Sequence, residues 1–109
     1  MKNTKRARLE AKGWRVGSVA EFLELSPGEA ALVETRLALS RTLRELRVAR
    51  KLTQGELARR LHSSQSRVAK MEAGDKSVSV DLLLKGLFAL GAHPGDVGRA
   101  LRRRTTSAA

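Results

Sequence analysis

The side chains with the clearest chemical potential in this sequence lie between Ser64 and Lys70. The amide of Gln65 can pair with both hydrogen-bonding groups of an adenine edge, and Lys70 can donate to guanine or to a phosphate. Ser64 and Ser66 are small, so a helix that carries them can enter a DNA groove about 12 Å wide. We therefore predict that Gln65, Ser66, Lys70 and Ser64 contact DNA bases from one helix.

Two short helices are expected to position these side chains, and capping residues mark where the first begins. Thr53 and Glu56 fit a Thr-x-x-Glu capping box, in which each side chain accepts a hydrogen bond from the other residue's backbone N–H. Leu52, directly before the cap, can pack on Leu57 as a hydrophobic staple. The first helix therefore begins at Gln54.

The second helix is expected from Gln65 to Ala73, after a sharp turn over residues 62–64. At about 100° per residue, Val68 and Met71 fall on one side of it, while small, polar and cationic residues fall on the other. Gly74 can end the helix in the left-handed conformation. The apolar side is expected in the core, which leaves the polar side for a ligand.

Basic and amide side chains beside these helices are candidates for contact with DNA phosphates. A basic run ends the preceding helix, and such a run is most often a solvated face. Its position next to the first short helix nevertheless favours a phosphate role for Arg50 and Lys51. The predicted backbone-contacting residues are Gln54, Arg67, Arg50, Lys51 and Arg59.

The pattern resembles the helix-turn-helix of the Cro and phage-repressor type, the xenobiotic-response-element (XRE) class of bacterial regulators. The resemblance is carried by Leu52-Thr53-Gln54, Glu56-Leu57-Ala58, Leu61, Ser64-Gln65-Ser66, Val68, Met71-Glu72, Gly74 and Ser79. It implies a lambda-repressor-like fold of five to six helices and sequence-specific binding of double-stranded DNA, as in a repressor of transcription. One departure is His62, which stands where the family usually has glycine, so we expect some strain from a left-handed histidine.

The composition agrees with an anionic partner. The 109 residues carry a net charge of +11, which favours nucleic acid.

Strand signals are limited to residues 77–80, so an all-α fold is expected. The lack of cysteine excludes disulfides and thiolate metal sites and suits a reducing cytoplasm. We predict no cofactor, no membrane span or signal peptide, and a cytoplasmic, nucleoid-associated protein.

The region before the helix-turn-helix is predicted to add a basic arm over residues 1–12, a Trp14-containing segment with a short helix over residues 18–25, and a long helix from Pro27 to Arg50. Residues 13–47 resemble the N-terminal extension of HigA-like antitoxins of type II toxin–antitoxin modules. This resemblance implies a small basic RNase toxin of the RelE/HigB type as a partner and repression of the module's own operon.

The region after the helix-turn-helix is predicted to form a helix capped by Ser79 that runs to Leu90. Its apolar residues surround most of the helix, and a small monomer cannot bury all of them. Exposed apolar area of this kind usually marks an interface, so we predict a two-fold homodimer that pairs through Leu84, Leu87 and Phe88.

We expect a frayed helix followed by disorder from residue 96 onward, with non-specific phosphate contact by its arginines as an alternative. The predicted parts are thus a basic arm and short helical extension at residues 1–31, an XRE-type domain at 32–92 and a basic tail at 93–109.

Other functional classes are less well supported by the residues. His62 and His93 are the only histidines, and the sequence has no phosphate-binding glycine loop and no metal-spaced ligand cluster, so we predict that the protein is not an enzyme. RNA binding is disfavoured because the three aromatic residues are too few to stack bases. A protein-interaction module that mainly neutralises a toxin, with DNA binding secondary, remains the alternative.

Overall fold

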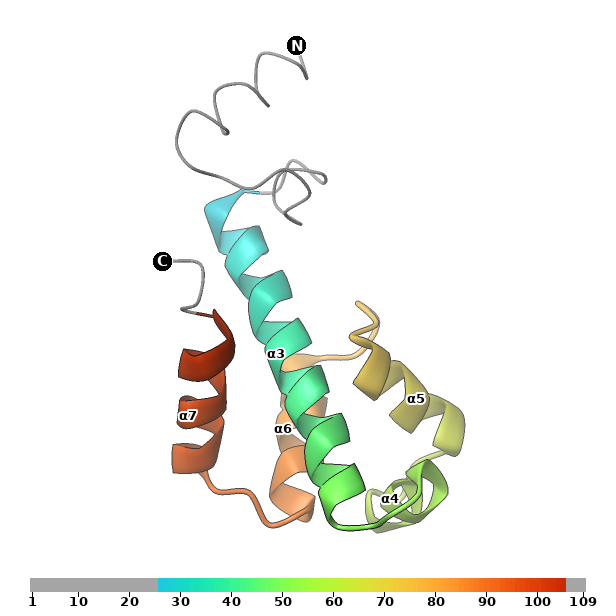
Figure 1. Ribbon diagram of the computed structural model, residues 1–109. Helices are drawn as coiled ribbons and strands as arrows, with labels where there is room; N and C mark the ends of the chain where they lie inside the picture. Colours follow the sequence, from blue (N-terminus) through green and yellow to red (C-terminus); the bar gives the residue numbers. More distant parts are fainter. Residues whose placement is uncertain (1–25, 106–109) are drawn as a thin grey trace. The chain divides into compact units, whose positions relative to one another are not determined.

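A computed structural model describes residues 26–105 of the chain. The helices in this range are α3 (Pro27–Ala49), α4 (Gln54–Arg60), α5 (Gln65–Ala73), α6 (Val80–Ala89) and α7 (Pro94–Thr105) (Figure 1). No strand occurs among the described residues, and the all-α fold is confirmed. The predicted arm, the Trp14 segment and the short helix over residues 18–25 lie outside this range.

The chain divides into two compact units, Met1–Val33 and Glu34–Ala109. In the first unit, the start of α3 is fixed by reciprocal hydrogen bonds. The Ser26 N–H donates to Glu29 Oε1 at 3.1 Å, and the Glu29 N–H donates to Ser26 Oγ at 3.2 Å. Pro27, whose φ is preset for a helix, occupies the first position. The helix thus begins where the sequence predicts.

The second unit contains the rest of α3 and the four helices that follow. α3 ends through two backbone hydrogen bonds, from Lys51 N–H to Val48 O at 2.9 Å and from Leu52 N–H to Arg47 O at 3.1 Å. Lys51 has a φ of 59°, a left-handed conformation in which glycine is more usual. This turn leads into α4 within a few residues.

The predicted start of α4 and both predicted ends of α5 are confirmed, together with the capping contacts behind them. Glu56 N–H donates to Thr53 Oγ1 at 3.1 Å and Thr53 N–H donates to Glu56 Oε1 at 2.9 Å, so α4 begins at Gln54. His62 has a φ of 54°, the left-handed conformation expected of it. Gly74 ends α5 with a φ of 72°.

The core of this unit is formed by apolar residues from all five helices and from the loop after α5. The fully buried members include Leu39 and Leu43 of α3, Leu57 of α4, and Met71 of α5. Burying one such side chain contributes about 1.5–3 kcal/mol. Gly86 lets α6 approach closely, because a Cβ there would lie 3.1 Å from both Leu43 Cδ1 and Met71 Cε.

The two C-terminal helices differ from expectation. α7 is a helix of 12 residues packed on the core, with Val97 and Ala100 buried and Leu101 partly buried, so the prediction of a frayed helix is wrong. In α6, Leu87 is 0% exposed, which leaves no side-chain surface for a second subunit and corrects its assignment to an interface. The sequence pattern did not show that Leu87 would join the core cluster of the monomer.

Candidate nucleic-acid interface

The outer face of α5 carries the side chains predicted to contact DNA. Val68 and Met71 are 0% exposed and face the core, as expected from their spacing. The exposed residues on and next to this helix include Ser64, Gln65, Ser66, Arg67 and Lys70. The helix thus presents an amide, hydroxyls and two cations on a rod that is fixed from behind.

One of the predicted base-contacting residues, Ser64, is the N-terminal cap of α5. Ser64 Oγ accepts a hydrogen bond from the Arg67 N–H at 3.2 Å and lies 3.3 Å from Ser66 Oγ. The Ser64 hydroxyl is therefore used mainly to start the helix. Gln65, at the first position of α5, and Ser66 extend the polar surface beyond that cap.

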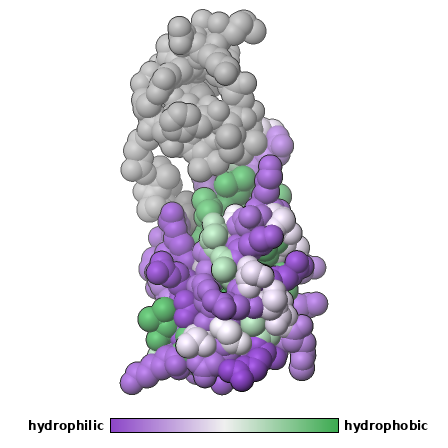
Figure 2. All heavy atoms as spheres, turned by 90° about the vertical axis from the view of Figure 1, so that its right-hand side faces the viewer, coloured by the Kyte–Doolittle hydropathy of each residue, from purple (hydrophilic) through white to green (hydrophobic). Residues whose placement is uncertain are grey.

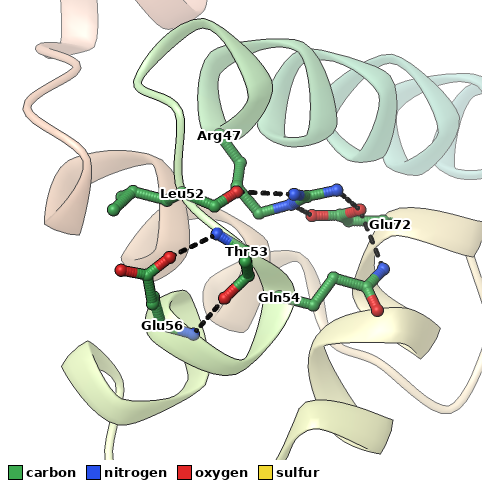
Figure 3. Close-up of polar contacts among 6 residues, drawn as sticks. All are labelled: Arg47, Leu52, Thr53, Gln54, Glu56 and Glu72. Carbon is green, nitrogen blue, oxygen red and sulfur yellow. Dashed lines mark hydrogen bonds and ion pairs between the residues drawn. The ribbon is translucent and has the colours of Figure 1, made fainter.

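A network of hydrogen bonds around Glu72 holds three helices together (Figure 3). Arg47 Nε and Nη2 donate to the two carboxylate oxygens of Glu72 at 2.5 and 3.0 Å, and Arg47 Nη1 donates to Leu52 O at 2.7 Å. The side chains are 13% and 4% exposed, respectively. Hydrogen bonding to Glu72 raises the pKa of the Arg47 guanidinium above its usual value, so the guanidinium stays charged.

Gln54 completes this network, which differs from its predicted role. Its Nε2 donates to Glu72 Oε1 at 3.1 Å, so one amide hydrogen that was expected to bind a phosphate binds a carboxylate instead. The Gln54 side chain thereby ties α4 to α5. Sequence reasoning missed the role of Arg47 and Glu72, because the two residues are 25 positions apart and no pattern in one sequence pairs them.

The other predicted phosphate-contacting residues lie at different places on this unit. Lys51, Arg59 and Arg67 are exposed, in the turn after α3, at the end of α4 and in the first turn of α5. Arg50 is also exposed, but its Nη2 lies 3.3 Å from the position a Cβ would take on Gly91. Arg50 therefore lies against the turn between α6 and α7.

The loop after α5 adds a cation that the sequence did not single out. Lys76 is exposed there, one residue after Asp75, whose Oδ1 accepts from the Ser77 N–H at 2.8 Å. Val78 is buried, and its carbonyl accepts from Arg36 Nε at 3.2 Å. These contacts hold the loop against α3 and leave Lys76 in solvent near the end of α5.

The face that contains α5 is mainly hydrophilic. Figure 2 views the molecule from the side on which α5 lies in Figure 1, and most of the coloured surface is hydrophilic or intermediate in hydropathy. In residues 26–105 no group of His, Asp or Glu side chains is placed to hold a metal ion. None of the described helices combines the length and apolar character needed to cross a membrane.

α4 and α5 are two short helices joined by a tight turn, and the second is exposed along its polar face. This arrangement defines a helix-turn-helix protein, a class that binds DNA. A family model described as a helix-turn-helix domain matches residues 38–101, and the chain belongs to this family. The matched range includes most of α7. No curated protein and no solved structure matches the chain.

Proposed function

We propose that this helix-turn-helix protein is a repressor that binds a specific sequence in double-stranded DNA through α5. The observation that carries the proposal is the division of α5 into a buried side, with Val68 and Met71, and an exposed side, with Gln65, Ser66 and Lys70. The exposed side matches the chemistry of base edges in the major groove. Repression follows when the bound site overlaps a promoter.

Binding would combine base contacts with a larger, sequence-independent attraction. Gln65, Ser66 and Lys70 would contact base edges, while Lys51, Arg59 and Arg67 would contact phosphates and displace condensed cations. Affinity should therefore fall steeply as salt rises. The Arg47–Glu72–Gln54 network supports this function by fixing the angle between α4 and α5.

Selection of bound duplexes from a random-sequence pool tests the proposal most directly. The full-length protein should enrich one consensus, and a reporter gene placed behind that consensus should be repressed when the protein is present. Recovery of unrelated sequences after several rounds would show that the protein binds DNA without reading it, and the proposal would then be wrong.

A homodimer is part of the proposal. Phe88 of α6 is 44% exposed and Leu84 is half-buried, so they can form the centre of a small apolar contact between two copies. A two-fold axis through such a contact would present two α5 helices to half-sites about 34 Å apart on DNA. The expected binding site is then an inverted repeat.

We further propose that the protein is the antitoxin of a type II module that represses its own operon. The support is the resemblance of residues 13–47 to HigA-like antitoxins, together with an acidic and apolar surface at the start of α3, where Glu29 is exposed and Leu32 is 48% exposed. Such a surface suits a basic RNase toxin of the RelE/HigB type. Co-expression with the neighbouring gene product tests this proposal, since a dedicated repressor should neither bind that product nor relieve its toxicity.

A further inference from the structure

α7 has two chemically distinct faces. Val97, Ala100 and Leu101 face the core, and Arg104, whose side chain is 17% exposed, pairs with Glu45 of α3. At about 100° per residue, the opposite face contains Gly95, Gly98, Arg99 and Arg102, with Arg103 at its edge. We call these five residues the outer face of α7.

The outer face is open and cationic. All five of its residues are exposed, and the Arg99 side chain is 66% exposed beside Asp96, with which it pairs. A Cβ on Gly98 would meet no atom within 4 Å, and one on Gly95 would meet only Arg99 Nη1, at 3.7 Å. The arginines therefore flank a stretch of helix backbone that a large partner can approach closely.

The character of this face favours DNA over an acidic protein. Guanidinium groups donate two parallel hydrogen bonds and so match phosphate oxygens well. Protein interfaces usually depend on a few large apolar or aromatic anchors. Among the described residues the exposed large hydrophobic side chains are Leu32, Val48 and Phe88, and none of these lies in α7.

The outer face of α7 and the DNA-binding face of α5 point away from each other. Glu45, which pairs with Arg104 of α7, and Arg47, which pairs with Glu72 of α5, are two residues apart in α3 and thus about 200° apart around that helix. Figure 1 accordingly shows α5 and α7 on opposite sides of α3. One short, straight duplex cannot touch both faces of the same subunit.

We propose that the outer face of α7 binds the phosphate backbone of a second DNA duplex while α5 holds the first. The protein would then bridge two DNA segments, which is a function beyond repression at one site. The inference rests on the proposed function in one respect, namely that α5 provides the first DNA contact. Because the face offers guanidinium groups and backbone but no amide, its binding should be independent of sequence.

A two-duplex capture assay tests the proposal. One random-sequence duplex is fixed on beads, and a second, fluorescent one stays in solution; both have about 20 base pairs, far below the persistence length of about 150 base pairs, so neither can wrap around the protein. The full-length protein is added, and both protein retention and capture of the fluorescent duplex are measured. The wild-type protein should capture the second duplex at low salt.

Two variants of the outer face should separate charge from folding. Arg102→Ala combined with Arg103→Ala removes two phosphate contacts and should lower capture about tenfold, with protein retention changed by no more than about twofold. Gly98→Leu keeps the charge and favours the helix, so it should keep or raise the melting temperature and still lower capture, because the side chain blocks close approach. Unchanged capture in both variants would overturn the inference and leave an acidic protein as the partner class of this face.

Two more variants distinguish failure of this inference from failure of the proposed function. Arg60→Ala combined with Lys85→Ala removes the same charge from exposed positions of α4 and α6, and should leave capture within about twofold of wild type. A loss as large as that of the α7 variant would mean that net charge alone causes bridging. That result would overturn the inference. Arg67→Glu combined with Lys70→Glu should weaken retention and abolish capture. Wild-type retention in that variant would instead contradict the role of α5 itself.

Discussion

At the scale of single residues, hydrogen-bond partners distinguish a side chain that can contact a base from one that holds the helices together. Gln54 and Gln65 are both glutamines at the first position of a short helix. The Gln54 amide donates to Glu72, whereas Gln65 is exposed on the outer face of α5. Gln65 is therefore the stronger candidate for reading a base.

We expect Gln65→Ala to weaken binding to the selected DNA site by about 1–3 kcal/mol, because a bidentate contact with a base is lost. Binding to unrelated duplexes should not change, since the phosphate contacts remain. Fluorescence anisotropy with the two duplexes at equal salt measures both values. An equal loss on both would show that Gln65 contributes no sequence information.

His62 should be replaceable with a gain in stability. A left-handed backbone costs a residue with a Cβ about 1–2 kcal/mol, and glycine avoids this cost but loses part of the gain through its freedom in the unfolded chain. We therefore expect His62→Gly, at a φ of 54°, to raise the free energy of unfolding by about 0.5–1 kcal/mol in urea titrations. Lower stability would mean that the imidazole makes a contact worth more than the strain.

At the scale of elements, α5 is held by two kinds of contact. Val68 and Met71 bury its inner side, and Glu72 binds α3 and α4 through Arg47 and Gln54. Apolar burial sets how strongly α5 is attached. The hydrogen bonds of Glu72 also fix the angle at which α5 is held.

We expect Glu72→Ala to lower the free energy of unfolding by about 3 kcal/mol, because it leaves the nearly buried Arg47 without its carboxylate. The double variant Arg47→Met, Glu72→Leu should recover much of that loss, since it removes both charges. DNA affinity should stay low in both variants because the angle between α4 and α5 is no longer fixed. A double-mutant cycle with no coupling would contradict the role of this pair.

The packing of α7 gives a second test at this scale. Val97 is 9% exposed in the core cluster, so we expect Val97→Ala to cost about 1–2 kcal/mol of stability. Gly98→Ala, on the exposed side one residue later, is the matched control and should be neutral or stabilising. Equal behaviour of the two variants in thermal melts would argue that α7 is not attached to the core in solution.

At the scale of the whole molecule, net charge and the proposed self-association bear on how the protein would bind DNA. A charge of +11 favours binding to any duplex, so in the proposed dimer selectivity would come from α5 and from pairing two copies on one site. Of the three α6 residues predicted for that pairing, Phe88 and Leu84 keep exposed surface.

We expect Phe88→Glu to shift the protein from dimer to monomer in sedimentation equilibrium, because like charges would face each other across the two-fold axis. The circular dichroism spectrum should be unchanged, since Phe88 is 44% exposed and outside the core. Arg60→Ala, at an exposed position of α4, should leave the dimer intact. A persistent Phe88→Glu dimer would place the interface on another surface.

The sequence by itself determined the starts of α3, α4 and α6 and both ends of α5. Thr53, Ser64 and Gly74 act on backbone groups within a few residues of themselves, so their effects can be read locally. The spacing of Val68 and Met71 likewise identified the buried side of α5, because helical periodicity is also a local property.

The tertiary structure alone decided which long-range partners meet. It paired Arg47 with Glu72, directed the Gln54 amide to that carboxylate, buried Leu87 in the monomer and attached α7 to the core through Val97. These contacts join residues far apart in the chain, and their existence depends on how the helices pack in three dimensions. A single sequence contains the side chains for such contacts but no local signal that selects one partner among several of the same type.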